Sequence, residues 1–499
     1  MKKYVMNKTS QQGTSPWRVR QWSMQWLLLA GFVVSLSACK NSQDDAITPG
    51  NTTSATVAEN LKVNRWILDN MRDYYYWNTK IPARPDTTQD PSDFFDSILY
   101  KFNETTNPDG DRFSWIQESA QELEAGLSGE STTTGLQYDL YLRSSGSTNV
   151  IAQVLYVLPN SPAQKAGLKR GDIISKVNGT LLTTTNYGDL LFTGTSFTYG
   201  LATVNSQSAI VDTDQTRSVT ATVFQENPVF LDSIYTIGSK KVGYLVYNQF
   251  VPQPNGSKSG EYDAQVDVIF ANFKAQGVNE LVLDLRYNPG GYVSSSTNLA
   301  SLIGKGVNSS KVYYRQEWNA VVTPYLQQEY GNSFFVENFM DKAQNIGANL
   351  SRVFVLTTDN TASASELIIN GLRPYMTINT VGTTTTGKNV GSITITDETG
   401  EIKWGMQPIV FKSYNASNQS DYATGFKPTI EVEEPLNLLP LGDTREALLG
   451  AALSQITGTA TLGRQAAANL NPLSTVGSSL QRKAGGAVIQ SVPLKVRNL

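Results

Sequence analysis

The chain has 499 residues, of which 40% are hydrophobic and 17% charged, and its formal net charge is -3 at pH 7. This length allows two or three domains with a large buried core, and the small charge does not favour nucleic-acid binding. The sequence contains no histidine and one cysteine. These counts exclude a Ser-His-Asp triad, a Cys-His dyad, a histidine-rich metal site and an intrachain disulfide. Acid–base chemistry near neutral pH must therefore use Lys, Asp, Glu, Tyr or a chain terminus.

The N-terminal stretch has the composition of an export signal. Basic residues precede the apolar run "WLLLAGFVVSLSAC", which is too short to span a bilayer comfortably and ends at Cys39. "LSAC" resembles a lipobox, which implies a signal over 1–38 and a lipidated Cys39; the alternative is an ordinary signal with a buried cysteine nearby. Residues 39–56 are polar and suit a tether. We expect an exported lipoprotein of a diderm bacterium, at the outer membrane and on its periplasmic or cell-surface face.

A helical region follows, which we place at 57–129. Apolar residues at helical spacing predict one helix within 57–82 and a second over 91–102, with Ser92 as the N-cap of the second. The aromatic run from Tyr74 to Trp77 is assigned to core packing.

The apolar pattern then takes on the period of strands, and we place a mainly β domain at 130–226. A strand is predicted over 150–157, followed by a short helix and by a strand that ends in a turn at Asn178–Gly179. The segment "NSPAQKAGLKRGDIISKVNG" (160–179) resembles the stretch typical of PDZ domains in bacterial proteases.

This resemblance implies a site for peptides. In PDZ domains, backbone N–H groups of one loop hold the peptide's terminal carboxylate while the peptide adds a strand to the sheet edge. The matching loop is "TGLQY", and its predicted peptide-binding residues are Gly135, Leu136, Gln137 and Tyr138. Gln137 stands where a small glycine is commoner, which leaves the ligand preference and the carboxylate grip open. A PDZ domain that only spaces or gates the rest of the chain is the alternative.

Strands and helices alternate over 227–458, which predicts a mixed sheet covered by helices on both faces. The expected elements are strands at 241–250, 279–291 and 351–360, helices at 261–277, 363–375 and 442–458 (the last with Asp443 as its cap), and a hairpin around Glu398–Gly400. Residues 459–499 are rich in small residues with weak periodicity, and we expect a loosely packed or partly disordered C-terminal tail.

One stretch of this region, "TDNTASASELIING" (358–371), places Ser363 at the start of a predicted helix. A hydroxyl there faces unsatisfied N–H groups and the positive end of the helix dipole, which stabilise an alkoxide or an oxyanion. The same position suits a plain N-cap, and "SASE" fits a capping box. The pattern alone leaves both interpretations open.

Two further segments favour catalysis. "DLRYNPGG" (284–291) ends a buried strand in two glycines whose N–H groups can approach a ligand closely. "TTTTGKNVG" (383–391) places Lys388 in a Gly/Thr-rich turn, a poor location for a merely solvated lysine. Together with "SASE", these segments resemble the C-terminal processing peptidases, also called tail-specific proteases, which are serine peptidases with a Ser-Lys dyad. The resemblance spans roughly residues 60–458 and implies an α/β fold: a mixed αβ catalytic core with an inserted PDZ domain and an N-terminal helical region.

The resemblance also implies roles for single residues. Ser363 matches the nucleophile and Lys388 the general base. The oxyanion would be held by backbone N–H groups of Gly290 or Gly291 and of Ala364.

The support of this dyad is less well defined. Glu366 and Thr385 match further polar positions around it. Pro374 stands where some members have an Asp, and Ser392 stands where several have a Gln that orients the lysine. The third member of the catalytic unit therefore stays open among Ser392, Thr385 and Glu366.

The chemistry requires a neutral Lys388. A lysine with the ordinary pKa near 10.4 is only ~0.1% neutral at pH 7.4, and burial lowers that pKa. The amine can then deprotonate Ser363 for attack on a peptide carbonyl, and no metal or organic cofactor is required. We predict a membrane-anchored serine endopeptidase whose partners are proteins or peptides with accessible C-termini, recognised through their C-terminal region by the PDZ domain, and not nucleic acid. The alternative is a catalytically silent, lipid-anchored peptide-binding or scaffold protein on the same fold.

Overall fold

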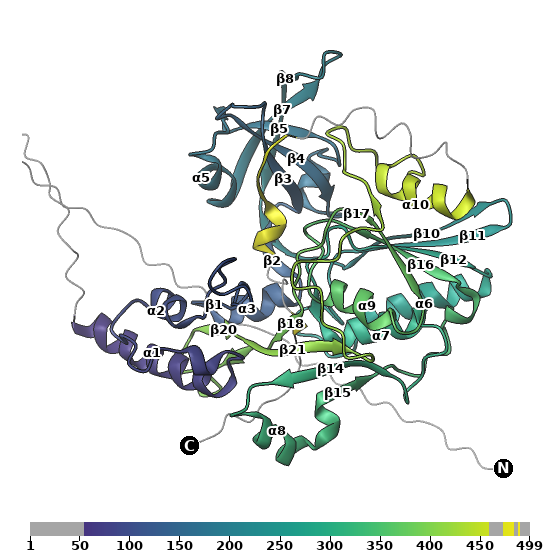
Figure 1. Ribbon diagram of the computed structural model, residues 1–499. Helices are drawn as coiled ribbons and strands as arrows, with labels where there is room; N and C mark the ends of the chain where they lie inside the picture. Colours follow the sequence, from purple (N-terminus) through teal and green to yellow (C-terminus); the bar gives the residue numbers. More distant parts are fainter. Residues whose placement is uncertain (1–53, 459–472, 484–487, 490–499) are drawn as a thin grey trace, which may run out of the picture. The chain divides into compact units, whose positions relative to one another are not determined.

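The computed structural model describes residues 54–458, 473–483 and 488–489 (Figure 1). The predicted signal over 1–38, Cys39 and most of the predicted tether lie outside these residues. None of the described helices is long and apolar enough to span a bilayer.

Two helices open the described part of the chain, near the predicted positions. α1 covers Ser54–Tyr74 and α2 covers Pro91–Ile98, and both pack into a core that they share with the αβ region. The predicted cap Ser92 is wrong: Asp90 caps α2, and its carboxylate accepts the N–H of Ser92. Pro91 fills the first helical position, so the residue before it becomes the cap. The region also contains η1 (Asn78–Lys80), β1 (Trp115–Gln117) and α3 (Ala120–Leu127).

The region predicted as a PDZ domain is mainly β and has its own hydrophobic core. Its elements are β2 (Glu130–Thr133), β3 (Leu136–Leu142), β4 (Val150–Val157), α4 (Pro162–Lys165), β5 (Ile173–Val177), β6 (Thr180–Leu181), α5 (Tyr187–Phe192), β7 (Ser196–Val204), β8 (Ile210–Thr220) and β9 (Thr222–Gln225). The strands β3-β4-β5-β7-β8 form an antiparallel sheet in this order, β6 pairs with β5, and β2 pairs with β9. The strand predicted over 150–157 is β4, and the turn predicted at Asn178–Gly179 has both residues at positive φ.

The αβ region is built on a six-stranded sheet. Its elements are β10 (Val229–Ile237), β11 (Lys240–Tyr247), α6 (Glu261–Ala275), β12 (Glu280–Asp284), α7 (Val293–Ile303), β16 (Arg352–Thr357), α9 (Ala364–Leu372), β17 (Thr377–Gly382), β22 (Ile430–Glu431) and α10 (Ala447–Thr457). The strand order is β10-β11-β12-β16-β17-β22, antiparallel at β10-β11 and parallel elsewhere.

Helices cover both faces of this sheet, as predicted. The helices α6, α7 and α9 pack on one face and α10 on the other (Figure 1). Neighbouring residues of β11 point to opposite faces, as a strand requires: Leu245 joins the core with α6, α7 and α9, whereas Val246 joins the core with α10.

A second six-stranded sheet carries the strands that follow the two predicted catalytic loops. Its strands, in the order β13-β24-β18-β21-β14-β15, are β13 (Gly291–Tyr292), β24 (Val488–Ile489), β18 (Val390–Ser392), β21 (Ile409–Asn415), β14 (Val312–Trp318) and β15 (Val336–Asn338). The remaining elements in this part of the chain are β19 (Ile395–Thr396), β20 (Gly405–Gln407), α8 (Thr323–Tyr330), η2 (Asn332–Phe335) and η3 (Gly347–Asn349). The pair β19–β20 is the hairpin predicted around Glu398–Gly400, and β20 also pairs with β1.

The start of α10 differs from the prediction. Its cap is Glu446, whose carboxylate accepts the N–H of Leu449, and not Asp443. Asp443 lies four residues before the helix begins at 447 and instead forms an ion pair with Arg445 at 2.6 Å. Asp443 and Glu446 could both cap a helix, and which of them does so depends on where the first helical turn begins.

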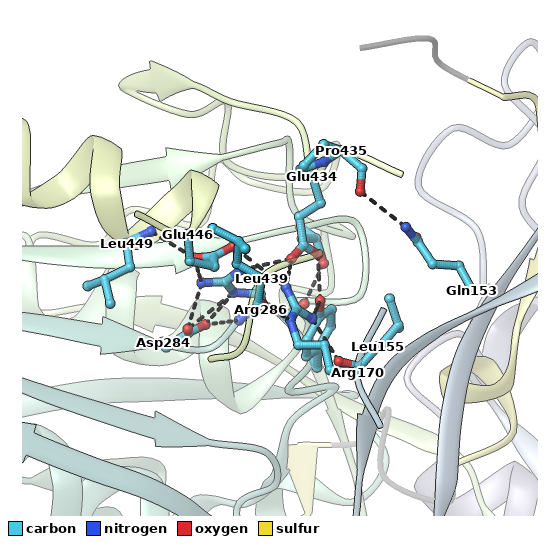
Figure 2. A network of polar contacts seen from close by, with 12 residues as sticks. Gln153, Leu155, Arg170, Asp284, Arg286, Glu434, Pro435, Leu439, Glu446 and Leu449 are labelled. Carbon is cyan, nitrogen blue, oxygen red and sulfur yellow. Dashed lines mark hydrogen bonds and ion pairs between the residues drawn. The ribbon is translucent and has the colours of Figure 1, made fainter. Parts of the chain in front are cut away.

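A buried network of charges joins the PDZ region to the αβ region (Figure 2). Arg286, which follows β12, forms ion pairs with Asp284 (2.8 Å), Glu446 (2.6 Å) and Glu434 (2.8 Å). Arg170, from the turn between α4 and β5, reaches Glu434 at 2.6 Å. Burial opposes ionisation of Glu434, but the two guanidinium groups hold its pKa well below the usual range. Buried charges are tolerated when each has partners, and this network fixes the "DLRYNPGG" segment from one side.

The described C-terminal residues are packed, which corrects the prediction of a loosely packed tail for these stretches. β23 (Thr475–Ser478) pairs with β3, and η5 (Ser479–Arg482) follows it. β24 pairs with β13 and β18 of the second sheet. The apolar residues that hold this segment, Val476 and Leu480, are too few to give a periodic signal, and their partners lie far away in the sequence.

Candidate active site

Ser363 occupies a strained backbone position at the start of α9. Its φ is +63° and its ψ is -115°, a conformation that non-glycine residues rarely adopt and that costs on the order of 1–3 kcal/mol. The side chain is fully buried, and among the described residues its Oγ has no hydrogen-bond partner. Ser363 is the N-cap of α9, and Glu366 at the third helical position accepts its N–H as in a capping box. The strained backbone and the buried, unpaired hydroxyl are features that capping alone does not require.

The glycine loop lies directly against Ser363. Gly290 has φ +113°, and a Cβ on it would lie 2.6 Å from the Cβ of Ser363 and 3.0 Å from its Oγ. The two segments are also joined by hydrogen bonds, because the carbonyl oxygen of Asn288 accepts from the N–H of Ala362 (3.2 Å) and from Oγ of Ser365 (2.9 Å). Glycine is thus required at 290 for the two segments to approach so closely.

The predicted oxyanion donors differ in their surroundings. The N–H of Gly290 already donates to Oδ1 of Asn288 at 2.9 Å. Phe250 exchanges hydrogen bonds with the peptide groups on either side of Gly291, so the N–H and C=O of Gly291 face the opposite edge of the strand. Ala364 is the first residue of α9, and its N–H has no acceptor within the helix. Ala364 is therefore better placed than Gly290 to donate to a ligand, whereas Gly291 faces the edge that β24 occupies in this structure and could donate to a ligand only in place of β24.

Glu366 connects the serine to the lysine loop. Its Oε2 accepts the backbone N–H groups of Ser363 (2.9 Å) and Lys388 (2.7 Å). Its Oε1 accepts from Oγ1 of Thr385 (2.5 Å) and from the N–H of Gly387 (2.7 Å). Burial raises the pKa of Glu366, and these hydrogen bonds oppose the rise. A fully buried carboxylate with donors on both oxygens holds the helix start and the lysine loop in one geometry.

Lys388 is buried, with 2% of its surface exposed, and its Nζ lies 4.8 Å from the centre of the Phe113 ring. Burial lowers the pKa of Lys388 to about 7; the carboxylates of Asp111 and Glu366 oppose this shift, and Arg112 adds to it. A large fraction of this amine is therefore neutral near pH 7, as a general base requires.

The loop before β1 was not predicted to belong to the site. It brings Asp111, Arg112 and Phe113 near Lys388, and Nη2 of Arg112 donates to the carbonyl oxygens of Gly387 (2.6 Å) and Ala423 (2.7 Å). This loop and the lysine are some 275 positions apart in the chain. The loop carries no catalytic motif, so nothing in the sequence indicates that it lies beside the lysine.

The positions that depart from the family pattern have distinct environments. Oγ of Ser392 donates to Oε1 of the buried Gln407 at 2.9 Å, and the Gln407 amide in turn donates to Oγ1 of Thr394. An amide from β20 therefore stands beside Ser392, a position that the sequence could not reveal. Pro374 lies beyond the C-terminal end of α9, whereas Ser363 stands at its start.

The predicted peptide-binding loop leads into β3. Gly135 has φ +82°, and a Cβ on it would lie 2.2 Å from a side-chain carbon of the turn that follows β4, so this position requires glycine. Leu136 is buried in the core of the domain. The N–H of Tyr138 donates to Oγ of Ser479 (2.8 Å), and this hydroxyl donates to Oε1 of Gln137 (2.7 Å). Two of the four predicted residues thus contact the C-terminal segment of the same chain.

Comparisons with known proteins identify the families that the chain resembles. The sequence model of peptidase family S41 matches residues 241–432, that of the peptidase S41 N-terminal domain matches 62–115, and that of a PDZ domain matches 153–192. The first match includes Ser363 and Lys388; the third begins after the predicted peptide-binding loop.

Relatives were found among sequences and among solved structures. A carboxyl-terminal-processing protease of Picosynechococcus sp. is 27% identical over 347 residues, covering 68% of this chain and 74% of that protein. A CtpA-like serine protease of Staphylococcus aureus is 23% identical over 331 residues, covering 65% of this chain and 58% of that protein. A crystal structure described as an S41 protease of Bacteroides fragilis is 30% identical with a TM-score of 0.64, covering 79% of this chain and 97% of that one.

Proposed function

Since the chain belongs to peptidase family S41 and carries a PDZ domain, we propose that it is a serine endopeptidase with a Ser363–Lys388 dyad. The observation that carries this proposal is the environment of the two residues. A buried hydroxyl without a partner lies on strained backbone, and Glu366 joins its peptide group to that of a buried lysine with a lowered pKa.

The proposed reaction uses protein groups alone. The neutral amine of Lys388 takes the proton of Ser363 as Oγ attacks the peptide carbonyl carbon. The N–H groups of Gly291 and Ala364 hold the resulting oxyanion, and each donor of this kind contributes a few kcal/mol. The ammonium of Lys388 then gives its proton to the leaving amine as the C–N bond breaks. Water, deprotonated by the same amine, attacks the acyl-enzyme; the bond to Oγ of Ser363 breaks, Lys388 returns the proton to Oγ, and the acid product leaves.

Glu366 and Thr385 act as positioning residues in this scheme. Oγ1 of Thr385 donates to Glu366 and accepts the N–H of Phe426 at 2.8 Å, which fixes the direction of both hydrogen bonds. Glu366 then holds the peptide groups of the nucleophile and of the base. Its role is to fix geometry and to supply negative charge near the amine.

The setting of the activity is also a proposal. The sequence up to Cys39 supports a lipid-anchored enzyme of the outer membrane, on its periplasmic or cell-surface face. The relative named a carboxyl-terminal-processing protease and the PDZ domain support protein substrates that are captured through their C-terminal region.

A fluorophosphonate probe with mass-spectrometric mapping tests the dyad. We expect labelling of Ser363 in the wild-type chain, no labelling in Ser363→Ala, and strongly reduced labelling in Lys388→Ala. The exposed residues Ser144 and Lys403 provide matched alanine controls that should label normally. Labelling of Ser363→Ala at the wild-type level would show that the nucleophile lies elsewhere.

A further inference from the structure

The sheet edge that a PDZ ligand would join is occupied by the chain itself. β23 pairs antiparallel with β3 in the register Thr475↔Tyr141, Gly477↔Leu140 and Ser478↔Asp139. The N–H of Leu142 extends the ladder by donating to the carbonyl oxygen of Ser474 at 2.8 Å. Strand addition to an exposed edge is the way in which such domains bind peptides, and here residues 474–478 make this addition.

Side chains anchor the segment on both sides of η5. Val476 packs against the core of the PDZ domain. Leu480 is 2% exposed and lies in an apolar cluster with Tyr156. Nζ of Lys483 forms an ion pair with Glu226 at 2.8 Å and a hydrogen bond with the Tyr156 hydroxyl at 3.0 Å. The segment is therefore held by two apolar side chains and, beyond η5, by a charged contact.

The loop meets a hydroxyl where a PDZ loop would meet a carboxylate. Oγ of Ser479 accepts from the N–H of Tyr138 and donates to Oε1 of Gln137. A serine hydroxyl satisfies both groups in the orientation that Gln137 adopts here, whereas a carboxylate has no proton to donate and would require the Gln137 amide to turn its nitrogen toward it. The chain also continues through η5 beyond this point. Gln137, the residue that departs from the common pattern, thus suits an internal segment with a serine.

The same segment reaches the edge that carries the candidate oxyanion donor. β24 runs parallel to β13, with Val488 opposite Gly291, and Ile489 lies opposite Ser392 of β18. The peptide groups of Gly291 face this edge, because its neighbours bond to Phe250 on the other side. One C-terminal stretch of the chain therefore pairs with the PDZ edge and with the strand beside Ser363.

We propose that Thr475–Arg482 is an internal ligand of the PDZ groove and competes there with polypeptides of the same chemistry. The recognised class is an internal stretch of the form Val-x-x-Ser-Leu, as in residues 476–480, rather than a free terminal carboxylate. The consequence for cleavage rests on the proposed function: the bound C-terminal segment would keep substrates from the edge of β3 and from the edge of β13. The binding itself needs no catalysis and can be tested without it.

The test uses the full chain with Ser363→Ala, so that no peptide is cleaved. The probe is the labelled peptide LSTVGSSLQRK (residues 473–483), acetylated and amidated, and its binding is followed by fluorescence anisotropy. We expect the release variant Val476→Asp/Leu480→Asp to bind it at least tenfold more tightly than the parent. Replacing the serine at the position of Ser479 by alanine in the peptide should weaken binding several-fold, and a free carboxylate on the peptide should not strengthen it. The exposed residues Val211 and Val223 provide a matched double-aspartate control that should behave as the parent.

A folded release variant that binds the labelled peptide no more tightly than the parent would overturn the proposal. Tighter binding of a peptide that ends in a free carboxylate at the position of Ser479 would overturn it as well. If the double variant does not fold, Val476→Ser/Ser479→Ala serves with hydrogen exchange as the readout. The amides of Tyr138 and Leu142 should be protected in the parent and exchange faster in this variant; equal exchange contradicts the proposal. If the chain that retains Ser363 is not labelled there by the fluorophosphonate, while the Ser363→Ala chain binds the peptide as expected, the dyad is rejected and the internal-ligand proposal stands.

Discussion

Gly290 lies so close to Ser363 that a Cβ on the glycine would be 2.6 Å from the serine Cβ. We therefore predict that Gly290→Ala displaces the serine and lowers kcat/KM by at least a hundredfold, because small misplacements of reacting groups cost that much. Overpacking and the positive φ should also destabilise the fold by about 1–3 kcal/mol. Gly188→Ala is the matched control, since a Cβ at 188 meets open space. Peptide hydrolysis and urea denaturation measure both effects; an unimpaired Gly290→Ala enzyme would show that this contact does not position the nucleophile.

A second prediction concerns the charge of Glu366. Its carboxylate raises the pKa of Lys388, against the effect of burial. Glu366→Gln should therefore lower that pKa and move the ascending limb of the pH–rate profile to lower pH. The rate itself should fall by one or two orders of magnitude, because an amide nitrogen cannot accept all the hydrogen bonds that the carboxylate accepts. A purely structural role would lower the rate without moving the limb, so an unmoved limb contradicts the electrostatic part of this account.

A third prediction links Lys388 to stability. Its pKa is about 7 in the folded chain and near 10.5 in the unfolded chain, so between these values the unfolded state binds more protons. Stability then rises with pH through this window, by up to about 1.4 kcal/mol per pH unit. Below pH 7 the lysine is charged in both states and the destabilisation is complete. Lys388→Met should exceed the wild type in stability most at pH 6, and the gap should narrow toward pH 10. Urea denaturation at several pH values measures this gap, and a constant gap would mean that the lysine titrates normally.

A fourth prediction tests the anchor. Cys39→Ser should move the protein from the membrane fraction to the soluble fraction and abolish labelling by a fatty-acid analogue, because acylation needs the thiol. Ser37→Ala, two residues earlier, serves as a control that keeps the thiol. Continued lipid labelling of Cys39→Ser in the membrane pellet would reject the lipobox.

The sequence predicted well the features that repeat locally. Strand and helix periodicity located β4, α6 and α9, and the motifs around Ser363, Gly290 and Lys388 identified three segments that the structure brings together. The two helix caps were predicted at the wrong residues: Asp90 lies two residues before Ser92, and Glu446 lies three residues after Asp443. The true cap depends on where the first helical turn begins.

Contacts between distant parts of the chain were not predictable in this way. Phe113 and Gln407 reach the site through loops and strands that carry no motif. The C-terminal segment docks through a few apolar anchors, chiefly Val476 and Leu480, and through backbone pairing, which any sequence can provide. Its weak periodicity was therefore mistaken for loose packing.

The pH dependence of kcat/KM for peptide hydrolysis, measured for the wild type and for Lys388→Arg, tests the central claim most directly. Only the neutral amine can accept the serine proton, so the wild-type rate should rise with pH through the lowered pKa of about 7 and then level. Lys388→Arg should stay nearly inactive at every pH, because a guanidinium remains protonated. A folded Lys388→Arg enzyme with near-wild-type turnover would contradict the assignment of Ser363 as a lysine-activated nucleophile.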